Sequence, residues 1–258
     1  MKRMLFKTII FTLVFSLLLS VSVSAKDGVY SWCTPRNGKK QPIFNKEASL
    51  VEEYGGFYID KNHGDSVEEK VLYLTFDAGY ENGNIEKILD VMSEKCVTGA
   101  FFVLDNLIIK NSDLVKRMKN EGHLICNHTK SHKDLTKCTE EGIKADLLEL
   151  EKICEENTGI TLDKYFRFPE GKYSIESLKC VNNLGYKTIF WSFGYADWDN
   201  DNQPSESYAI KKILSNTHNG AVILLHPTSS TNAKIFPVLI DAWRDEGYRF
   251  GTLDELTR

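Results

Sequence analysis

The sequence predicts an α/β fold, because short apolar segments alternate with amphipathic helical patterns from about residue 70 to the C-terminus. Seven segments have the length and composition of buried strands: 71–76, 100–104, 123–126, 165–168, 188–193, 221–225 and 248–252. Strands that alternate with helices in this way form a parallel sheet with helical crossovers. At this point the pattern fits either an open doubly wound sheet or a barrel.

The segments between these strands each carry one apolar face. Ile85, Ile88, Leu89, Met92 and Cys96 recur at the spacing of a single helix face. Shorter stripes of the same kind contain Leu114 and Met118; Ile143, Leu147 and Leu150; Ile175, Leu178 and Val181; Ala209 and Ile213; and Phe236, Leu239, Ile240 and Trp243. Several of these stripes end at a glycine, which predicts the C-terminus of a helix.

The N-terminal segment resembles an export signal rather than part of the fold. A basic start, "MKRMLFK", precedes the apolar run "TIIFTLVFSLLLSVSV" and the small-residue site "VSA". This three-part pattern predicts a signal peptide at residues 1–25 and export across the cytoplasmic membrane. The alternative is an uncleaved membrane anchor. Residues 26–65 are expected to form an irregular lead-in packed on a single catalytic domain at 66–258.

Charge and cysteine content exclude some classes of function. Removing residues 1–25 also removes three basic residues and changes the formal charge from −4 to −7. An acidic chain without a basic cluster is a poor nucleic-acid binder. The six cysteines form no C-x-x-C pair, so buried free thiols are expected for most of them, with Cys33 the most exposed; disulfides are the alternative for an exported chain.

Residues with catalytic chemistry follow the predicted strands. In parallel α/β folds the active site lies at the carboxyl ends of the strands. The residues in these positions are Asp77, His128, His132, Arg167, Asp197, Trp198 and His226. Their common location predicts that they share one edge of the sheet.

The two histidines of "HTKSH" suggest a metal site. His128 and His132 are four residues apart, so on a helical turn both imidazoles would lie on one face. Imidazole nitrogens suit zinc or another first-row divalent ion. Two surface histidines at this spacing also occur by chance, so the motif alone is weak evidence.

Each of the other residues has a structural explanation when taken singly. Asp77 could cap the helix that follows it, and Arg167 could form an ordinary ion pair. His226 could be a hydrogen-bonded core histidine, Asp197 part of a solvated acidic loop, and Trp198 a core residue. Separate explanations account poorly for all of these residues falling at one edge.

Five segments resemble the polysaccharide deacetylases, carbohydrate esterase family four. The segments "TFDAG", "HTKSH", "RFPEG", "ADW" and "LLHP" occur in the order and approximate spacing of that family's five motifs, from about Lys70 to the C-terminus. The resemblance implies a distorted (β/α)7-type barrel. It also implies metal-dependent removal of acetyl groups from N-acetylated sugars or, in some members, from acetylated xylan.

Further segments are similar to a subgroup, the δ-lactam-biosynthetic de-N-acetylases. These are the extended "TFDAGYENG", the lead-in "SW…RNGKKQP" and "LLHPTSSTN". The similarity implies a substrate, N-acetylmuramic acid in a peptidoglycan glycan strand, and a location in the cell wall or spore envelope space. We expect a monomer. The alternatives are deacetylation of N-acetylglucosamine in peptidoglycan or chitin-like polymers, and a catalytically silent glycan-binding protein.

The resemblance also implies catalytic roles. Asp77 would be the general base and Arg167 its ion-pair partner. His226 would be the general acid for the departing amine, with Asp197 fixing its tautomer. The presence of all four favours an enzyme over a pure binder, which needs neither acid nor base.

The remaining motif residues correspond to the family's binding positions. His128 and His132 would hold the metal, for which zinc is the expected identity. The main-chain N–H of Glu170 would be the oxyanion donor, and Trp198 and Leu224 would line the acetyl and sugar pocket.

The sequence departs from the family pattern at two motif positions. Ala78 replaces the acidic metal ligand of the first motif, and Gly194 stands where the fourth motif has its first acidic residue. Only two protein ligands are then assigned, whereas catalytic zinc usually has three, so weak metal binding is expected.

Overall fold

The computed structural model describes residues 28–258. The predicted signal peptide, residues 1–25, lies outside the described residues and stays a prediction. Within residues 28–258, no helix is both long enough and apolar enough to span a bilayer.

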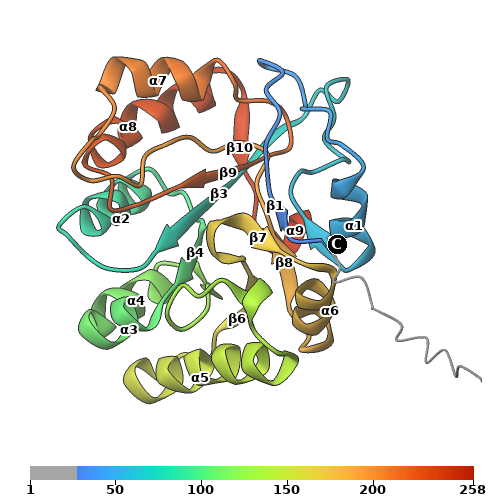
Figure 1. The fold of residues 1–258 in the computed structure, drawn as a ribbon. Helices are drawn as coiled ribbons and strands as arrows, with labels where there is room; N and C mark the ends of the chain where they lie inside the picture. The colour runs from blue at the N-terminus through green and yellow to red at the C-terminus, as the bar shows by residue number, and fades with distance from the viewer. Residues whose placement is uncertain (1–27) are drawn as a thin grey trace, which may run out of the picture.

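The predicted α/β fold is confirmed. Its core is an eight-stranded sheet in which β3 (Lys70–Ala78) is the longest strand (Figure 1). The strand order is β10-β3-β4-β5-β6-β8-β2, with β9 also paired to β3, and every pairing is parallel. The bounds are β2 Gly56–Phe57, β4 Ala100–Val103, β5 Leu124–Asn127, β6 Asp163–Phe166, β8 Lys187–Ile189, β9 Ala221–Leu225 and β10 Tyr248–Phe250.

The sheet curls into a half-barrel, so the barrel alternative is the correct one. β9 pairs with β3 from Leu72 to Phe76, and Phe193, beyond the end of β8, forms an isolated parallel bridge to Ile223 on β9. Figure 1 shows the helices on the outside of the curved sheet. The distorted (β/α)7-type barrel that the sequence resemblance implies is therefore confirmed.

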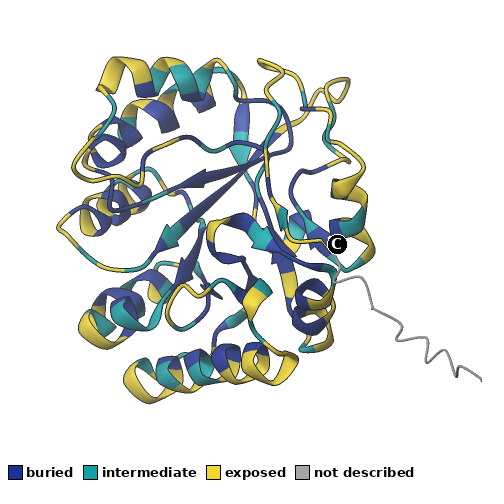
Figure 2. Ribbon diagram, in the orientation of Figure 1, coloured by how far each residue is buried: buried dark blue, intermediate teal, exposed yellow. Residues whose placement is uncertain are grey.

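Alternating side chains of β3 face two different cores. Val71 and Tyr73 belong to the inner core with residues such as Phe102 and Val222. Leu74 and Phe76 belong to the outer core, which lies under the helices. The strand is therefore buried on both faces, as its continuous apolar sequence indicates, and Figure 2 shows buried strands surrounded by helices with exposed outer faces.

The helices begin and end where local chemistry favours it. Thr139 caps the N-terminus of α5 by accepting a hydrogen bond from the Gly142 N–H, and Gly159 ends that helix in the left-handed conformation. The helices of the barrel are α2 Ile85–Glu94, α3 Asp105–Lys110, α4 Ser112–Asn120, α5 Glu140–Thr158, α6 Ile175–Asn183, α7 Glu206–Leu214, α8 Ser230–Asp245 and α9 Leu253–Leu256, with 3-10 turns at Leu135–Lys137 and Pro169–Gly171.

Residues 28–65 are more regular than the sequence indicates. They form β1 (Tyr30–Ser31), α1 (Glu47–Glu53) and β2, and β2 joins the main sheet beside β8. β1 pairs with the short strand β7 (Lys172–Tyr173). Two-residue strands show no detectable sequence period, which is why the pattern missed them.

All six cysteines are free thiols, and Cys33 is exposed as expected; three of the six are buried, Cys126, Cys154 and Cys180, rather than most of them. The placement of Cys96 on the buried face of a helix is wrong, because α2 ends at Glu94. Cys96 follows in the left-handed region, with φ 49°, and is exposed. The buried face of α2 therefore ends at Met92.

Candidate active site

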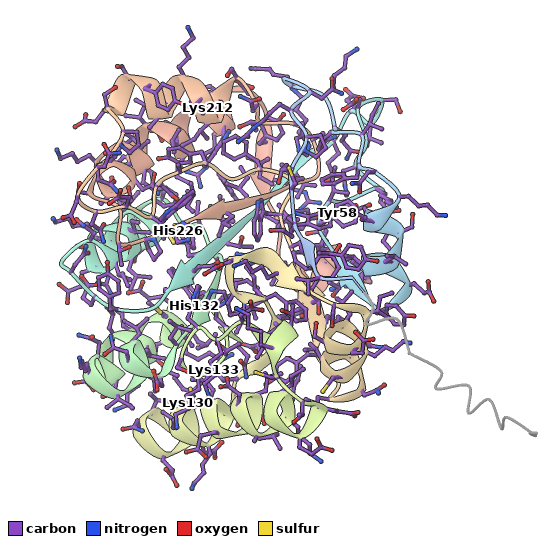
Figure 3. The ribbon with its side chains drawn as sticks, viewed as in Figure 1. Tyr58, Lys130, His132, Lys133, Lys212 and His226 are labelled. Atoms are coloured by element: carbon purple, nitrogen blue, oxygen red, sulfur yellow. The ribbon has the colours of Figure 1, made fainter. Side chains whose placement is uncertain are left out.

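The site lies at the carboxyl ends of the strands. Asp77 is the penultimate residue of β3, so it lies in the strand rather than after it. His128, Arg167 and His226 directly follow β5, β6 and β9. Parallel strands bring these ends to one edge, and Figure 3 shows His132 and His226 beside the ends of the central strands.

Asp77 is held by a fully buried arginine. Arg167 Nη1 donates to Asp77 Oδ1 at 2.8 Å, while Nη2 donates to Thr75 Oγ1 and Nε to the Ile189 carbonyl. Burial alone would raise the pKa of Asp77, but the Arg167 guanidinium and the nearby imidazoles outweigh it and hold that pKa below its usual value. Asp77 is therefore ionised at neutral pH, and it does not cap α2, whose N-cap is Asn84.

His226 forms a pair with a buried carboxylate. Its Nδ1 donates to Asp197 Oδ1 at 2.7 Å, and its backbone N–H donates to Asp197 Oδ2 at 2.9 Å. Asp197 is 1% exposed, so it is not part of a solvated loop. Burial lowers the pKa of His226, but the Asp197 carboxylate outweighs this effect and raises it above the usual histidine value.

His128 and His132 are neighbours, but not on a helix. The helical turn expected from their spacing is wrong: Thr129 and His132 have φ of 70° and 58°, and the segment is a loop. The loop still brings the two rings to a centroid distance of 5.0 Å. Threonine and histidine usually avoid positive φ, so the sequence does not predict this backbone conformation.

His128 has the tautomer that a metal-binding imidazole needs. Its Nδ1 lies 2.9 Å from the Arg167 carbonyl and donates to it, which leaves Nε2 without a proton, 3.5 Å from Asp77 Oδ2. Burial lowers the pKa of His128 to about 4, so the ring is neutral at pH 7. Neutral imidazole is the form that binds metal ions.

The two neighbouring imidazoles do not by themselves make a complete metal site. Across residues 28–258, no group of three or more His, Cys, Asp and Glu side chains is arranged to hold a metal ion. Ala78 is fully buried and packs in the outer core. The structure thus fits a divalent ion held by His128 and His132 with fewer protein ligands than usual.

Glu170 adopts an unusual backbone conformation beside these groups. It lies in the 3-10 turn Pro169–Gly171 with φ 55° and ψ 11°, in the left-handed region that most residues avoid. Its side chain pairs with Lys172 and is 57% exposed. The turn therefore determines the position of the Glu170 main chain, whereas the carboxylate extends into solvent.

Seven of the nine residues proposed from the sequence line one cavity of about 650 Å³. Arg167 and Asp197 are buried behind it, where they contact Asp77 and His226. Trp198 is at the rim and 60% exposed, which excludes a core role. The cavity is lined by Asp77, Gly79, Tyr80, Leu104, His128, His132, Glu170, Trp191, Trp198, Leu224, His226 and Thr228.

Tyr80 and Thr228 line the cavity but were not singled out in the sequence. Tyr80 accepts a hydrogen bond from the Asn200 side chain, which links the loop after β3 to the loop before α7. The Thr228 carbonyl accepts from the side-chain amides of Asn82 and Asn84. Both lie inside the extended segments "TFDAGYENG" and "LLHPTSSTN", which was the available signal.

Comparison with known proteins agrees with this geometry. Residues 64–189 match the family described as polysaccharide deacetylase. The chain is 39% identical to the peptidoglycan-N-acetylmuramic acid deacetylase PdaA of Bacillus subtilis (strain 168), over 81% of this chain and 77% of that protein. It is 31% identical to the peptidoglycan-N-acetylglucosamine deacetylase of Bacillus cereus, over 74% of this chain and 89% of that protein.

Similarity to a solved structure extends over most of the chain. The structure of Bacillus subtilis PdaA, described as a family 4 carbohydrate esterase, superimposes with a TM-score of 0.82 and 38% identity, covering 88% of this chain and 96% of that one. Deacetylases of this family are typically metal-dependent hydrolases. The chain therefore belongs to the polysaccharide deacetylase family, carbohydrate esterase family four, and is a hydrolytic deacetylase.

Proposed function

We propose that the enzyme removes the N-acetyl group from N-acetylmuramic acid in peptidoglycan. The observation that carries the reaction is a single cavity lined by an ionised aspartate, two neighbouring imidazoles and a carboxylate-paired histidine. The substrate is supported by the higher identity to the muramic acid deacetylase, 39% against 31% for the glucosamine deacetylase. The extended first and fifth motifs support the same choice.

The reaction replaces the amide C–N bond with a C–O bond from water. Asp77 takes a proton from the water molecule while the water oxygen bonds to the acetyl carbonyl carbon. Arg167 keeps Asp77 ionised and oriented. His226 then gives its proton to the amine nitrogen as the C–N bond breaks. Acetate and a free sugar amine are the products.

His128 and His132 would hold a divalent ion, which we propose is zinc. Such an ion would supply Lewis-acid chemistry there, polarising the acetyl carbonyl and lowering the pKa of a water molecule. The Arg167 carbonyl fixes His128 with Nε2 deprotonated. With Ala78 at the first motif, we expect the metal to be held weakly.

Three further residues would position the acetyl group and sugar. The Glu170 N–H would donate to the developing oxyanion. Leu224, 6% exposed, would contact the acetyl methyl. The exposed Trp198 ring would pack against the sugar, as aromatic side chains combine apolar area with low conformational freedom.

The proposed product indicates the biological process in which the enzyme acts. A free amine on muramic acid lies beside the lactyl carboxyl group of the same sugar, and the two can condense with loss of water to a cyclic amide, the muramic δ-lactam. We therefore place the enzyme in spore cortex synthesis. The predicted signal peptide agrees with this location, because peptidoglycan lies outside the cytoplasmic membrane.

Product analysis tests the substrate. The protein is incubated with zinc and purified glycan strands, with and without stem peptides, and the sugars are then identified by mass spectrometry. We expect acetate and muramic residues with free amines. Free amines only on glucosamine would favour the second substrate, and no acetate with any divalent metal would favour a glycan-binding protein.

Metal titration tests the two-histidine site separately. Zinc binding is measured by calorimetry on the parent protein and on His128→Ala. Loss of one imidazole should weaken zinc binding at least about 10-fold, in line with the effects of removing even outer-shell partners. Equal affinities in the two proteins would place the metal elsewhere.

A further inference from the structure

We propose that Asn232, supported by Tyr195, is a positioning residue that holds Asp197 in register with His226. This inference rests on the proposed role of His226 as general acid. Asn232 lies in the first turn of α8, six residues after His226; it is the last residue of the extended segment "LLHPTSSTN" and lies outside the shorter motif "LLHP". It is fully buried behind the cavity rather than exposed to substrate.

The Asn232 amide joins both members of the pair. Its Nδ2 donates to Asp197 Oδ2 at 2.6 Å and to the His226 carbonyl at 3.1 Å. With the His226 N–H also donating to Oδ2, that oxygen is fixed and Oδ1 is left for the imidazole. A single side chain therefore defines the rotation of the carboxylate and the position of the backbone that carries His226.

Tyr195 determines which way the amide points. Its hydroxyl donates to Asn232 Oδ1, and the two Nδ2 hydrogens are already used. Burial raises the pKa of Tyr195 well above its usual value, so the hydroxyl keeps its proton at any working pH. An inverted amide would place an oxygen against the Asp197 carboxylate and is therefore excluded.

The backbone of Asn232 is anchored as firmly as its side chain. Ser229 caps α8, and its Oγ accepts the Asn232 N–H at 3.0 Å. The positive end of the helix dipole favours a nearby anion. The N-terminus of α8 thus presents both an amide donor and a favourable electrostatic field to the buried Asp197 carboxylate.

The charges around His226 predict what the loss of this donor does. His226 faces the Asp197 and Asp77 carboxylates, the Arg167 guanidinium and the Trp198 ring. Without the Asn232 amide, the Asp197 carboxylate accepts one hydrogen bond fewer and therefore attracts the His226 imidazolium more strongly. The orientation of the carboxylate is also less restricted. We therefore expect slower proton transfer and an alkaline limb of activity moved to higher pH.

Asn232→Leu removes the hydrogen-bond donor but keeps approximately the shape of the side chain. We expect kcat to fall about 10- to 100-fold, the range for losing a hydrogen bond to a charged group, with KM within about two-fold. Tyr195→Phe should give a smaller fall in kcat, because the amide remains but can rotate. The matched control is Asn219→Leu: Asn219 bonds four backbone groups at the opposite end of the barrel, and its loss should reduce stability with kcat unchanged.

A double variant separates positioning from general damage. In a His226→Ala background, Asn232→Leu should cause little further loss of kcat, because the residue acts through His226. Additive losses, or an Asn232→Leu enzyme with parental kcat and pH profile, would overturn the inference. A fully active His226→Ala enzyme would instead refute the general-acid role. If Asn232→Leu fails to fold, Tyr195→Phe carries the same kcat and pH test.

Discussion

Two histidine–aspartate pairs among residues 28–258 share a hydrogen bond, and only one of these two borders the cavity. His226 and Asp197 lie 2.7 Å apart at the carboxyl end of the strands, and His63 and Asp60 lie 2.6 Å apart near Tyr73. Both aspartates are buried, at 1% and 5% exposure. The pair itself is therefore not what indicates catalysis.

The second nitrogen of each histidine distinguishes the pairs. In His63, Nδ1 contacts Asp60 and Nε2 lies 3.6 Å from Glu69 Oε2, so both nitrogens face carboxylates. In His226, Nδ1 is used by Asp197, and the ring borders the cavity with Nε2 free to act on a ligand. A buried carboxylate behind one nitrogen and a cavity at the other is the arrangement that supports proton transfer.

The largest expected effect tests whether this end of the barrel performs the chemistry at all. Asp77→Asn removes the proposed base and should lower kcat by about 10²- to 10⁴-fold. Arg167 keeps its bonds to Thr75 and Ile189, so the fold should persist. Acetate release measures activity and circular dichroism checks folding; parental kcat in a folded variant would remove Asp77 from the mechanism.

Replacing each histidine sharpens the contrast between the pairs. His226→Ala should lower kcat about 100-fold or more, since it removes the proposed acid. His63→Ala should leave kcat within about two-fold but lower the free energy of unfolding by about 1–3 kcal/mol, because Asp60 loses a buried partner. Steady-state kinetics and urea unfolding measure the two effects. Similar kinetic losses in both variants would contradict the distinction.

Replacing each aspartate gives a smaller effect, on pH dependence. Protonated His226 is the proposed active form, so activity falls as pH rises through its raised pKa. Asp197→Asn removes the carboxylate that raises this pKa and leaves the effect of burial, so the alkaline limb should move to lower pH. An unmoved limb in the pH–kcat profile would show that another group controls it.

Asp60→Asn is the matched control, and it should change stability instead. Burial would raise the pKa of Asp60, but hydrogen bonds from Tyr73 and His63 outweigh this and lower it. Its carboxylate therefore stabilises the fold above its unfolded pKa of about 3.9, and this contribution is lost as pH falls through the lower folded value. Unfolding measured across pH should show a deficit in Asp60→Asn at neutral pH that shrinks in acid.

The fold was predictable because its elements are long and periodic. β3 is apolar on both faces, which is typical of a parallel strand covered by helices, and all seven strands proposed from the sequence are present. The two-residue strands β1, β2 and β7 were missed because they are too short to show a period. The loop that carries His128 and His132 was wrongly expected to be helical, because spacing alone carries no information about positive φ.

The sequence by itself determined the strand–helix alternation and the types of residue at the strand ends, since both follow from local periodicity. The family resemblance also implied the pairing of His226 with Asp197. Only the tertiary structure showed the second pair, His63 and Asp60, and that His63 does not line the cavity. His63 and Asp60 are three residues apart, whereas His226 and Asp197 are 29 apart, so proximity in sequence favours the wrong pair. Asn232 likewise gains its place beside Asp197 through the packing of α8. The physical reason is that a side chain acts through the atoms left unpaired and accessible, and contacts between distant segments decide which atoms these are.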